Sequence, residues 1–87
     1  MIMKKYKCPC CNNFTFVDKP DGNYAICPVC FWEDDPLAYD DPDEECSCNG
    51  LSLNQAKYNY ISFGACCLEM RGHVRKPFIS ETVNGES

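Results

Sequence analysis

The sequence predicts a small α+β domain stabilised by a metal, in which a zinc-ribbon β-hairpin packs with one or two C-terminal helices. Three observations predict this fold. The chain carries two Cys-x-x-Cys pairs separated by fifteen residues. A turn-forming segment lies between the pairs, and a helix with clear start and stop signals follows them. A chain of 87 residues buries only about 60% of its unfolded surface, so its core needs a staple.

The spacing of the two cysteine pairs predicts one structural zinc ion. Soft thiolates favour zinc, and four of them leave no coordination position open. Iron in a rubredoxin-like site is a weaker alternative, because four thiolates also hold iron. Rubredoxin-like sites usually carry glycine after each second cysteine, and Asn12 and Phe31 stand there instead, which favours zinc. The expected ligands are Cys8, Cys11, Cys27 and Cys30.

The fifteen residues between the pairs predict a β-hairpin. Residues 13–17 are aromatic and β-branched, as is typical of a strand, and residues 24–26 are suited to the returning strand. Between them, residues 18–23 contain proline and glycine, which favour a turn. The excursion out and back would place the second pair beside the first, so turn chemistry and ligand spacing agree.

The segment after the second pair is strongly acidic. Residues 33–45 contain eight acids and two prolines, which is typical of a solvated loop. A sharper interpretation is an acidic recognition surface, whereas the spacing does not match a calcium-binding loop. Trp32 is either a core anchor or an exposed contact for a partner. The candidate partner surface consists of Trp32, Glu33, Asp34 and Asp35.

The next segment predicts a helix from Leu53 to about Phe63. Ser52 and Gln55 have the spacing of a capping box, and Gly64 is a typical helix terminator. The apolar face that we expect to pack on the hairpin consists of Leu53, Ala56, Tyr60, Ile61 and Gly64.

The remainder of the chain predicts less regular structure. Residues 65–72 are consistent with a second short helix, followed by an extended segment that ends at Phe78. From residue 79 onward the pattern shows no periodicity. We therefore expect one domain over residues 1–78 and a disordered tail over residues 79–87.

Composition narrows the classes of partner and compartment. The formal net charge is −5, which disfavours phosphate backbones and anionic membrane surfaces. No apolar stretch approaches the ~20 residues that span a bilayer, and the first residues lack the apolar core of a signal peptide. Nine cysteines is an odd number, and their paired spacing is typical of metal sites more than of disulfides. A cytoplasmic protein with reduced thiols is expected.

Five cysteines remain outside the expected zinc site. Cys10 could replace Cys8 or Cys11 as a ligand, but we expect it to point outward, since Cys8 and Cys11 already keep the required gap. A second zinc site would have to join Cys46 and Cys48, before the helix, to Cys66 or Cys67, after it. We disfavour this site, because eleven helical residues separate the two ends of the helix by ~16 Å. Redox catalysis is also disfavoured, since acids beside Cys46 raise its thiol pKa. The remaining thiols, of which Cys66 or Cys67 is expected in the core, are Cys46, Cys48, Cys66 and Cys67.

Several separated motifs together resemble one known family. They are Cys8-Pro9-Cys10-Cys11, the run from Cys27 to Asp35, the run from Asn49 to Ala56, Phe63-Gly64-Ala65, and Val74-Arg75-Lys76-Pro77. Over about residues 7–78 the chain resembles the bacterial cysteine-rich CPCC domain, a zinc-ribbon-like family. The resemblance implies an intracellular bacterial protein with both Cys-x-x-Cys turns as ligands, but no reaction or substrate. The cysteines at 46, 48 and 67 depart from the family pattern.

Function is expected to lie in binding and not in catalysis. The leading hypothesis is a protein-interaction module that meets a basic partner through Trp32 and the acids at 33–35. One alternative is a nucleic-acid-binding ribbon, by analogy of fold; another is a thiol redox protein. The basic residues that would serve nucleic acid are Lys4, Lys5, Lys7, Arg71, Arg75 and Lys76.

Overall fold

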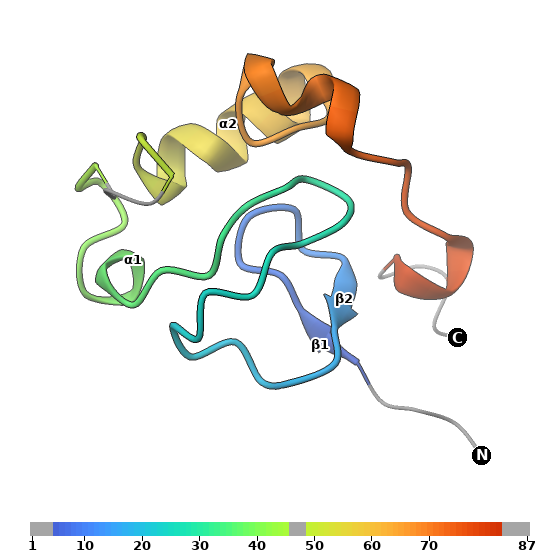
Figure 1. Ribbon diagram of the computed structural model, residues 1–87, viewed down its shortest axis with the longest axis horizontal. Coiled ribbons are helices and arrows are strands. Elements are labelled where there is room, and N and C mark those ends of the chain that lie inside the picture. The colour runs from blue at the N-terminus through green and yellow to red at the C-terminus, as the bar shows by residue number, and fades with distance from the viewer. Residues whose placement is uncertain (1–4, 46–48, 83–87) are drawn as a thin grey trace.

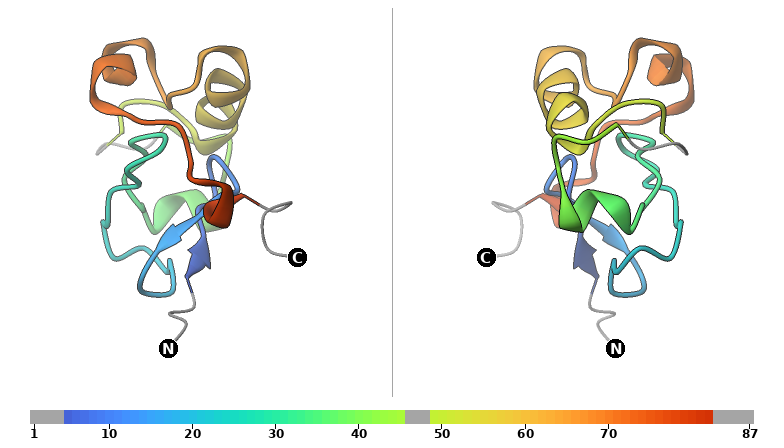
Figure 2. Two further views of the ribbon diagram at one scale, coloured as in Figure 1. Left: turned by 90° about the vertical axis from the view of Figure 1, so that its right-hand side faces the viewer. Right: turned by 90° about the vertical axis from the view of Figure 1, so that its left-hand side faces the viewer.

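The computed structural model describes residues 5–45 and 49–82. The elements in chain order are β1 (Tyr6–Lys7), β2 (Phe14–Phe16), α1 (Leu37–Asp40), α2 (Leu53–Phe63), and the 3-10 helices η1 (Leu68–His73) and η2 (Ile79–Glu81). Helices α2 and η1 lie side by side over the irregular N-terminal half, which contains both strands (Figures 1 and 2). None of the described helices is long and apolar enough to cross a membrane.

The two strands form an antiparallel pair around the first Cys-x-x-Cys turn. Tyr6 lies opposite Phe16 and Lys7 opposite Phe14. The expected hairpin between residues 13–17 and 24–26 is therefore wrong in its pairing, because β2 pairs with β1. Each Cys-x-x-Cys turn, called a knuckle below, brings its own flanks together. Closing this short loop costs less chain entropy than closing the longer one between the knuckles.

The flanks of the second knuckle meet in the same way. Ile26 forms an isolated antiparallel bridge with Glu33. Just beyond it, the Tyr24 amide donates to the Asp34 carbonyl and the Asp34 amide donates to the Ala25 carbonyl, each at 2.9 Å. The segment between the knuckles therefore folds onto the chain that leaves the second knuckle. Gly22 lies in this segment with φ of 94°, and a Cβ there would lie 2.6 Å from Pro36 Cβ, so the turn needs glycine.

Helix α2 confirms the bounds predicted from its end signals. The Ser52 hydroxyl accepts a hydrogen bond from the Gln55 amide at 3.1 Å, and Gly64 ends the helix with φ of 85°. The bond to Ser52 is one half of the predicted capping box. The Gln55 side chain, which would form the other half, donates to Asn59.

The apolar face of α2 is narrower than the sequence predicts. Leu53 and Ala56 are buried and Tyr60 is partly buried against the core, but Ile61 is 84% exposed. The prediction for Ile61 is wrong because a helix turns about 100° per residue, so Ile61 lies about 140° around the axis from Ala56.

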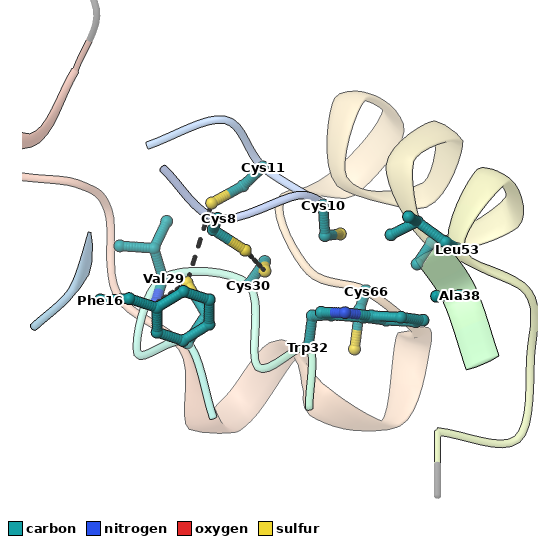
Figure 3. Packing of buried hydrophobic residues seen from close by; sticks show 12 residues of the cluster. Cys8, Cys10, Cys11, Phe16, Val29, Cys30, Trp32, Ala38, Leu53 and Cys66 are labelled. Atoms are coloured by element: carbon teal, nitrogen blue, oxygen red, sulfur yellow. Dashed lines mark hydrogen bonds between the residues drawn. The ribbon is translucent and has the colours of Figure 1, made fainter. Parts of the chain in front are cut away.

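The core forms beneath α2, around the knuckle cysteines. Trp32 is fully buried there beside Cys66 and Ala38, so its interpretation as a core anchor is confirmed (Figure 3). Val29 and Phe16 close the opposite side of the cysteine cluster. The cysteines are therefore part of the packing as well as candidate ligands.

The C-terminal part departs from expectation at two places. The second helix is the 3-10 helix η1, which begins at Leu68 and not at residue 65, because Ala65 and Cys66 are buried against the core. Residues 79–82 are not a disordered tail, since η2 lies next to β2 and buries Glu81. The ion pair between Glu81 and Arg75, at 2.9 Å, fixes this segment. Residues 83–87 lie outside the described residues.

Candidate metal centre

Four thiols from the two knuckles meet at one point. Their Sγ atoms all lie within 4.8 Å of one another. The shortest separations are 3.7 Å between Cys8 and Cys30 and 3.8 Å between Cys11 and Cys27. Sulfurs at about 2.3 Å from a tetrahedral ion are about 3.8 Å apart, so this spacing fits a metal ion. All four are free thiols and at most 8% exposed.

The two knuckles have the same backbone geometry. In the first, the Cys8 amide donates to the Asn13 carbonyl at 2.8 Å, and the Asn12 amide donates to the Cys8 carbonyl at 2.9 Å. The second repeats both bonds nineteen residues later, from the Cys27 amide to Trp32 at 3.0 Å and from the Phe31 amide to Cys27 at 2.8 Å. This repetition makes the two halves of the site equivalent, with each knuckle supplying two sulfurs.

The residue after each second cysteine lies in the left-handed region. Asn12 has φ of 64° and Phe31 has φ of 68°. This is the conformation that glycine adopts most readily, and a non-glycine residue there is strained. The absence of glycine at these two positions therefore does not indicate a different knuckle geometry. Asn12 and Phe31 therefore do not favour zinc over iron.

Hydrogen bonds to sulfur concentrate on Cys27. The Thr15 hydroxyl lies 3.1 Å from Cys27 Sγ, and the Val29 amide donates to the same sulfur at 3.4 Å. Hydrogen bonds from the neighbouring thiols lower the pKa of Cys27, and the bond from Cys11 has the largest effect. The bond from Thr15 lowers it further. Cys27 is therefore the sulfur best prepared to be a thiolate.

The environment of Cys30 shows what a cation would change. The surrounding thiols raise the pKa of Cys30 well above its usual range, and Cys10 has the largest effect. Thiolates this close repel one another in a buried site. A divalent cation among the four sulfurs would reverse this effect and hold all of them deprotonated. The arrangement is therefore suited to a bound metal ion.

Cys10 points inward, contrary to expectation. It is 3% exposed and lies between the thiol cluster and Leu53 of α2 (Figure 3). Its equivalent in the second knuckle, Val29, is fully buried as well. The third residue of each knuckle faces the core, and the apolar Val29 was the sequence signal that could have shown this for Cys10.

The candidate partner surface is mostly buried. Trp32 and Asp34 are fully buried, Asp35 is 6% exposed, and Glu33 is half-buried. These four residues therefore do not form an exposed recognition surface, and that interpretation is wrong. The Asp35 carboxylate instead accepts the Leu37 amide at 2.8 Å and starts the short helix α1 inside the expected loop.

The structure also changes the interpretation of the remaining cysteines. Cys66 is buried, which confirms a core thiol after α2, and Cys67 is half-buried. Cys46 and Cys48 lie outside the described residues. Asn49 and Cys66, which lie on either side of α2, line the same cavity. The second zinc site weighed above includes Cys46 and Cys48, so it stays a prediction outside the described residues. The segments that flank α2 both contact residues 30–33: Asn49, before the helix, bonds to Glu33, and the Cys66 amide, after the helix, bonds to Cys30.

Comparison with known proteins agrees with the resemblance seen in the motifs. Residues 6–81 match the family described as cysteine-rich CPCC. The match spans both knuckles, α2 and the segment that ends in η2. No curated protein is similar enough to count as a relative.

Proposed function

Because the chain belongs to the cysteine-rich CPCC family, we propose that it is a non-enzymatic protein-interaction module built on one structural Zn²⁺. The observation that carries the metal assignment is the convergence of four buried thiols at the spacing of a tetrahedral site. Soft thiolates suit zinc, and a complete shell of four sulfurs offers no position to a substrate.

Metal analysis of the protein tests the zinc assignment. Cells grown with both zinc and iron in the medium supply the chain for elemental analysis and visible absorption spectroscopy. We expect about one zinc per chain and no visible colour, as a four-sulfur zinc site requires. An iron content that tracks thiolate-to-iron absorption bands would show that the centre is an iron site.

The partner surface that we propose lies in the acidic run of residues 40–45. Its acids are exposed and follow the buried pair Asp34 and Asp35. The surface extends from the end of α1 toward the start of α2. A cluster of exposed negative charges attracts a basic partner at long range and speeds its association. The acids of this surface are Asp40, Asp41, Asp43, Glu44 and Glu45.

A pair of charge-matched triple variants tests this surface. Asp40→Asn with Asp41→Asn and Glu45→Gln removes charge from the run. Asp18→Asn with Asp21→Asn and Glu69→Gln removes the same charge from exposed acids elsewhere. In quantitative affinity capture at two salt concentrations, only the first variant should lose partners that the native chain retains. Equal loss in both variants would leave net charge, and not this surface, as the cause.

A nucleic-acid-binding function is the second candidate, and one observation favours it. Lys5 near the N-terminus and Arg75 near the C-terminus both contact Glu81, at 3.9 and 2.9 Å. The two basic segments of the sequence therefore meet. We rank this function lower because the buried Glu81 carboxylate already neutralises Arg75 through two hydrogen bonds. Filter binding at low salt separates the two candidates.

A thiol redox function is the third candidate and has the least support. Burial is the main cause that raises the pKa of the Cys66 thiol to about 12, and the neighbouring Cys67 is the second cause. A reactive redox thiol needs a lowered pKa. Turnover of a disulfide substrate by the metal-loaded chain that is lost in Cys66→Ser would be required to support this candidate.

A further inference from the structure

Three sulfur-containing residues line a small cavity next to the second knuckle. The cavity has a volume of about 80 Å³, and its lining includes Cys66, Cys67 and Met70 together with Phe31, Glu33 and Asn49. Sites for organic ligands usually measure about 300–1,000 Å³. This cavity is therefore too small for a typical organic ligand and has room for an ion.

Backbone hydrogen bonds hold the first cysteine of this group in place. The Cys66 amide donates to the Cys30 carbonyl at 2.8 Å, and the Cys66 carbonyl accepts the Asn59 side chain at 2.9 Å. The first bond attaches this segment to the second knuckle, and the second attaches it to α2. Cys66 is therefore fixed before any ligand arrives.

The 3-10 geometry of η1 brings the other two sulfur residues together. The Met70 amide donates to the Cys67 carbonyl at 3.1 Å. Cys67 is the extended residue just before η1, and both it and Met70 line the cavity. Both are half-buried, while Cys66 is 3% exposed. The cavity lining therefore combines one buried cysteine with two residues that solvent can reach.

We propose that Cys66, Cys67 and Met70 form a second metal site, distinct from the knuckles, that binds one Cu(I) ion. Two thiols and a thioether are a soft donor set, and thioether sulfur selects Cu(I), whereas zinc sites use Cys, His and carboxylate ligands. Each thiol that binds Cu(I) releases its proton to solvent, and no electron is transferred. The four-thiol centre has no vacant position for this ion once its own metal is bound.

Anaerobic titration of the metal-loaded full chain tests the site. Cu(I) is added in competition with a chromogenic Cu(I) chelator, while a zinc-sensitive dye reports metal loss from the knuckles. We expect about one Cu(I) per chain with no zinc release. Met70→Leu keeps the volume of the side chain and should weaken Cu(I) binding by about tenfold or more, because even groups outside the ligand shell contribute that much.

Two double variants distinguish the three residues from the other thiols. Cys66→Ser with Cys67→Ser should abolish high-affinity uptake. Cys46→Ser with Cys48→Ser removes the same number of thiols and should leave uptake unchanged. The proposal is wrong if Met70→Leu binds Cu(I) as the native chain does, or if the second double variant loses uptake. Zinc release that matches copper uptake would also overturn it, because copper would then occupy the knuckles.

Discussion

The Tyr39 hydroxyl donates a 2.6 Å hydrogen bond to the fully buried carboxylate of Asp34. The other carboxylate oxygen accepts the backbone amides of Gly22 and Asn23 at 2.8 and 3.2 Å. One side chain thus joins the turn between the knuckles to helix α1. Burial, followed by the hydrogen bond to Asp34, raises the pKa of Tyr39, so the hydroxyl keeps its proton as donor.

Asp34→Asn should destabilise the fold and leave the acidic surface unchanged. An amide would place an N–H group against donors that now face oxygen, and hydrogen bonds to a charged group contribute about 1.5–3 kcal/mol each. We expect a loss of about 2–3 kcal/mol in the free energy of unfolding, measured by urea denaturation of the metal-loaded protein.

The control for this prediction is Asp18→Asn, which removes the same charge from an exposed position outside the acidic surface. Its effect should stay within about 0.5 kcal/mol. If the two variants were equally stable and Asp34→Asn alone weakened partner binding, Asp34 would be a recognition residue after all.

Features that depend on local sequence were predicted from it, and those that depend on pairing were not. Ser52 specifies the start of α2 through its side-chain hydroxyl, and Gly64 specifies the end through its left-handed backbone. The cysteine spacing identifies the four thiols that the structure brings together. The partner of β2 had two candidates along the chain, residues 6–7 and 24–26. The first knuckle folds back on itself and places residues 6–7 beside β2, which decides the pairing.

Burial of the acids was also missed, although a signal for it exists. Residues two apart on an extended chain share a face. Glu33 takes part in an antiparallel bridge, so Trp32 and Asp34 point to the same side. If Trp32 is a core anchor, Asp34 should be buried with it. This alternation is hidden in the high net charge of residues 33–45.

Removal of the metal should unfold the centre of the molecule. Structural zinc in small domains is worth about 10–16 kcal/mol of apparent binding free energy, most of it realised as folding. A strong chelator should therefore shift the fluorescence of the buried Trp32 to the red and abolish amide protection around both knuckles. Cys8→Ser should behave like the chelated protein, while Cys67→Ser, outside the four-thiol centre, should retain the fold. A chelated chain with unchanged Trp32 emission would show that the packed core suffices alone.

The ion pair of Glu81 should give the C-terminal segment a pH-dependent stability. The hydrogen bonds from Arg75 lower the pKa of Glu81, so the folded carboxyl holds its proton less tightly than the unfolded one. Its contribution is therefore complete above the unfolded value of about 4.3 and is lost as pH falls through the lower, folded value. Arg75 is partly exposed, so solvent screening limits the contribution to about 1 kcal/mol.

Glu81→Gln tests this contribution at the Phe78 amide, which donates to Glu81 Oε1 at 2.8 Å. Hydrogen exchange of this amide should be faster in the variant at neutral pH, and the difference from the native chain should shrink below about pH 4. Glu69→Gln, at an exposed position, is the matched control. Equal exchange in native chain and variant at neutral pH would show that the ion pair does not hold η2.

Thr15→Val should loosen the metal without removing it. The substitution keeps the side-chain shape and deletes the hydroxyl that lies 3.1 Å from Cys27 Sγ. Groups that hydrogen-bond to metal ligands typically contribute about 10–100-fold in metal affinity. We expect the same metal content but weaker binding within this range, measured by competition with a chromogenic zinc chelator. Thr82→Val removes a hydroxyl that bonds to the Ile79 carbonyl, far along the chain from both knuckles, and should change nothing. Equal affinities in the two variants would mean that the Val29 amide and the three other sulfurs stabilise the Cys27 thiolate without help from Thr15.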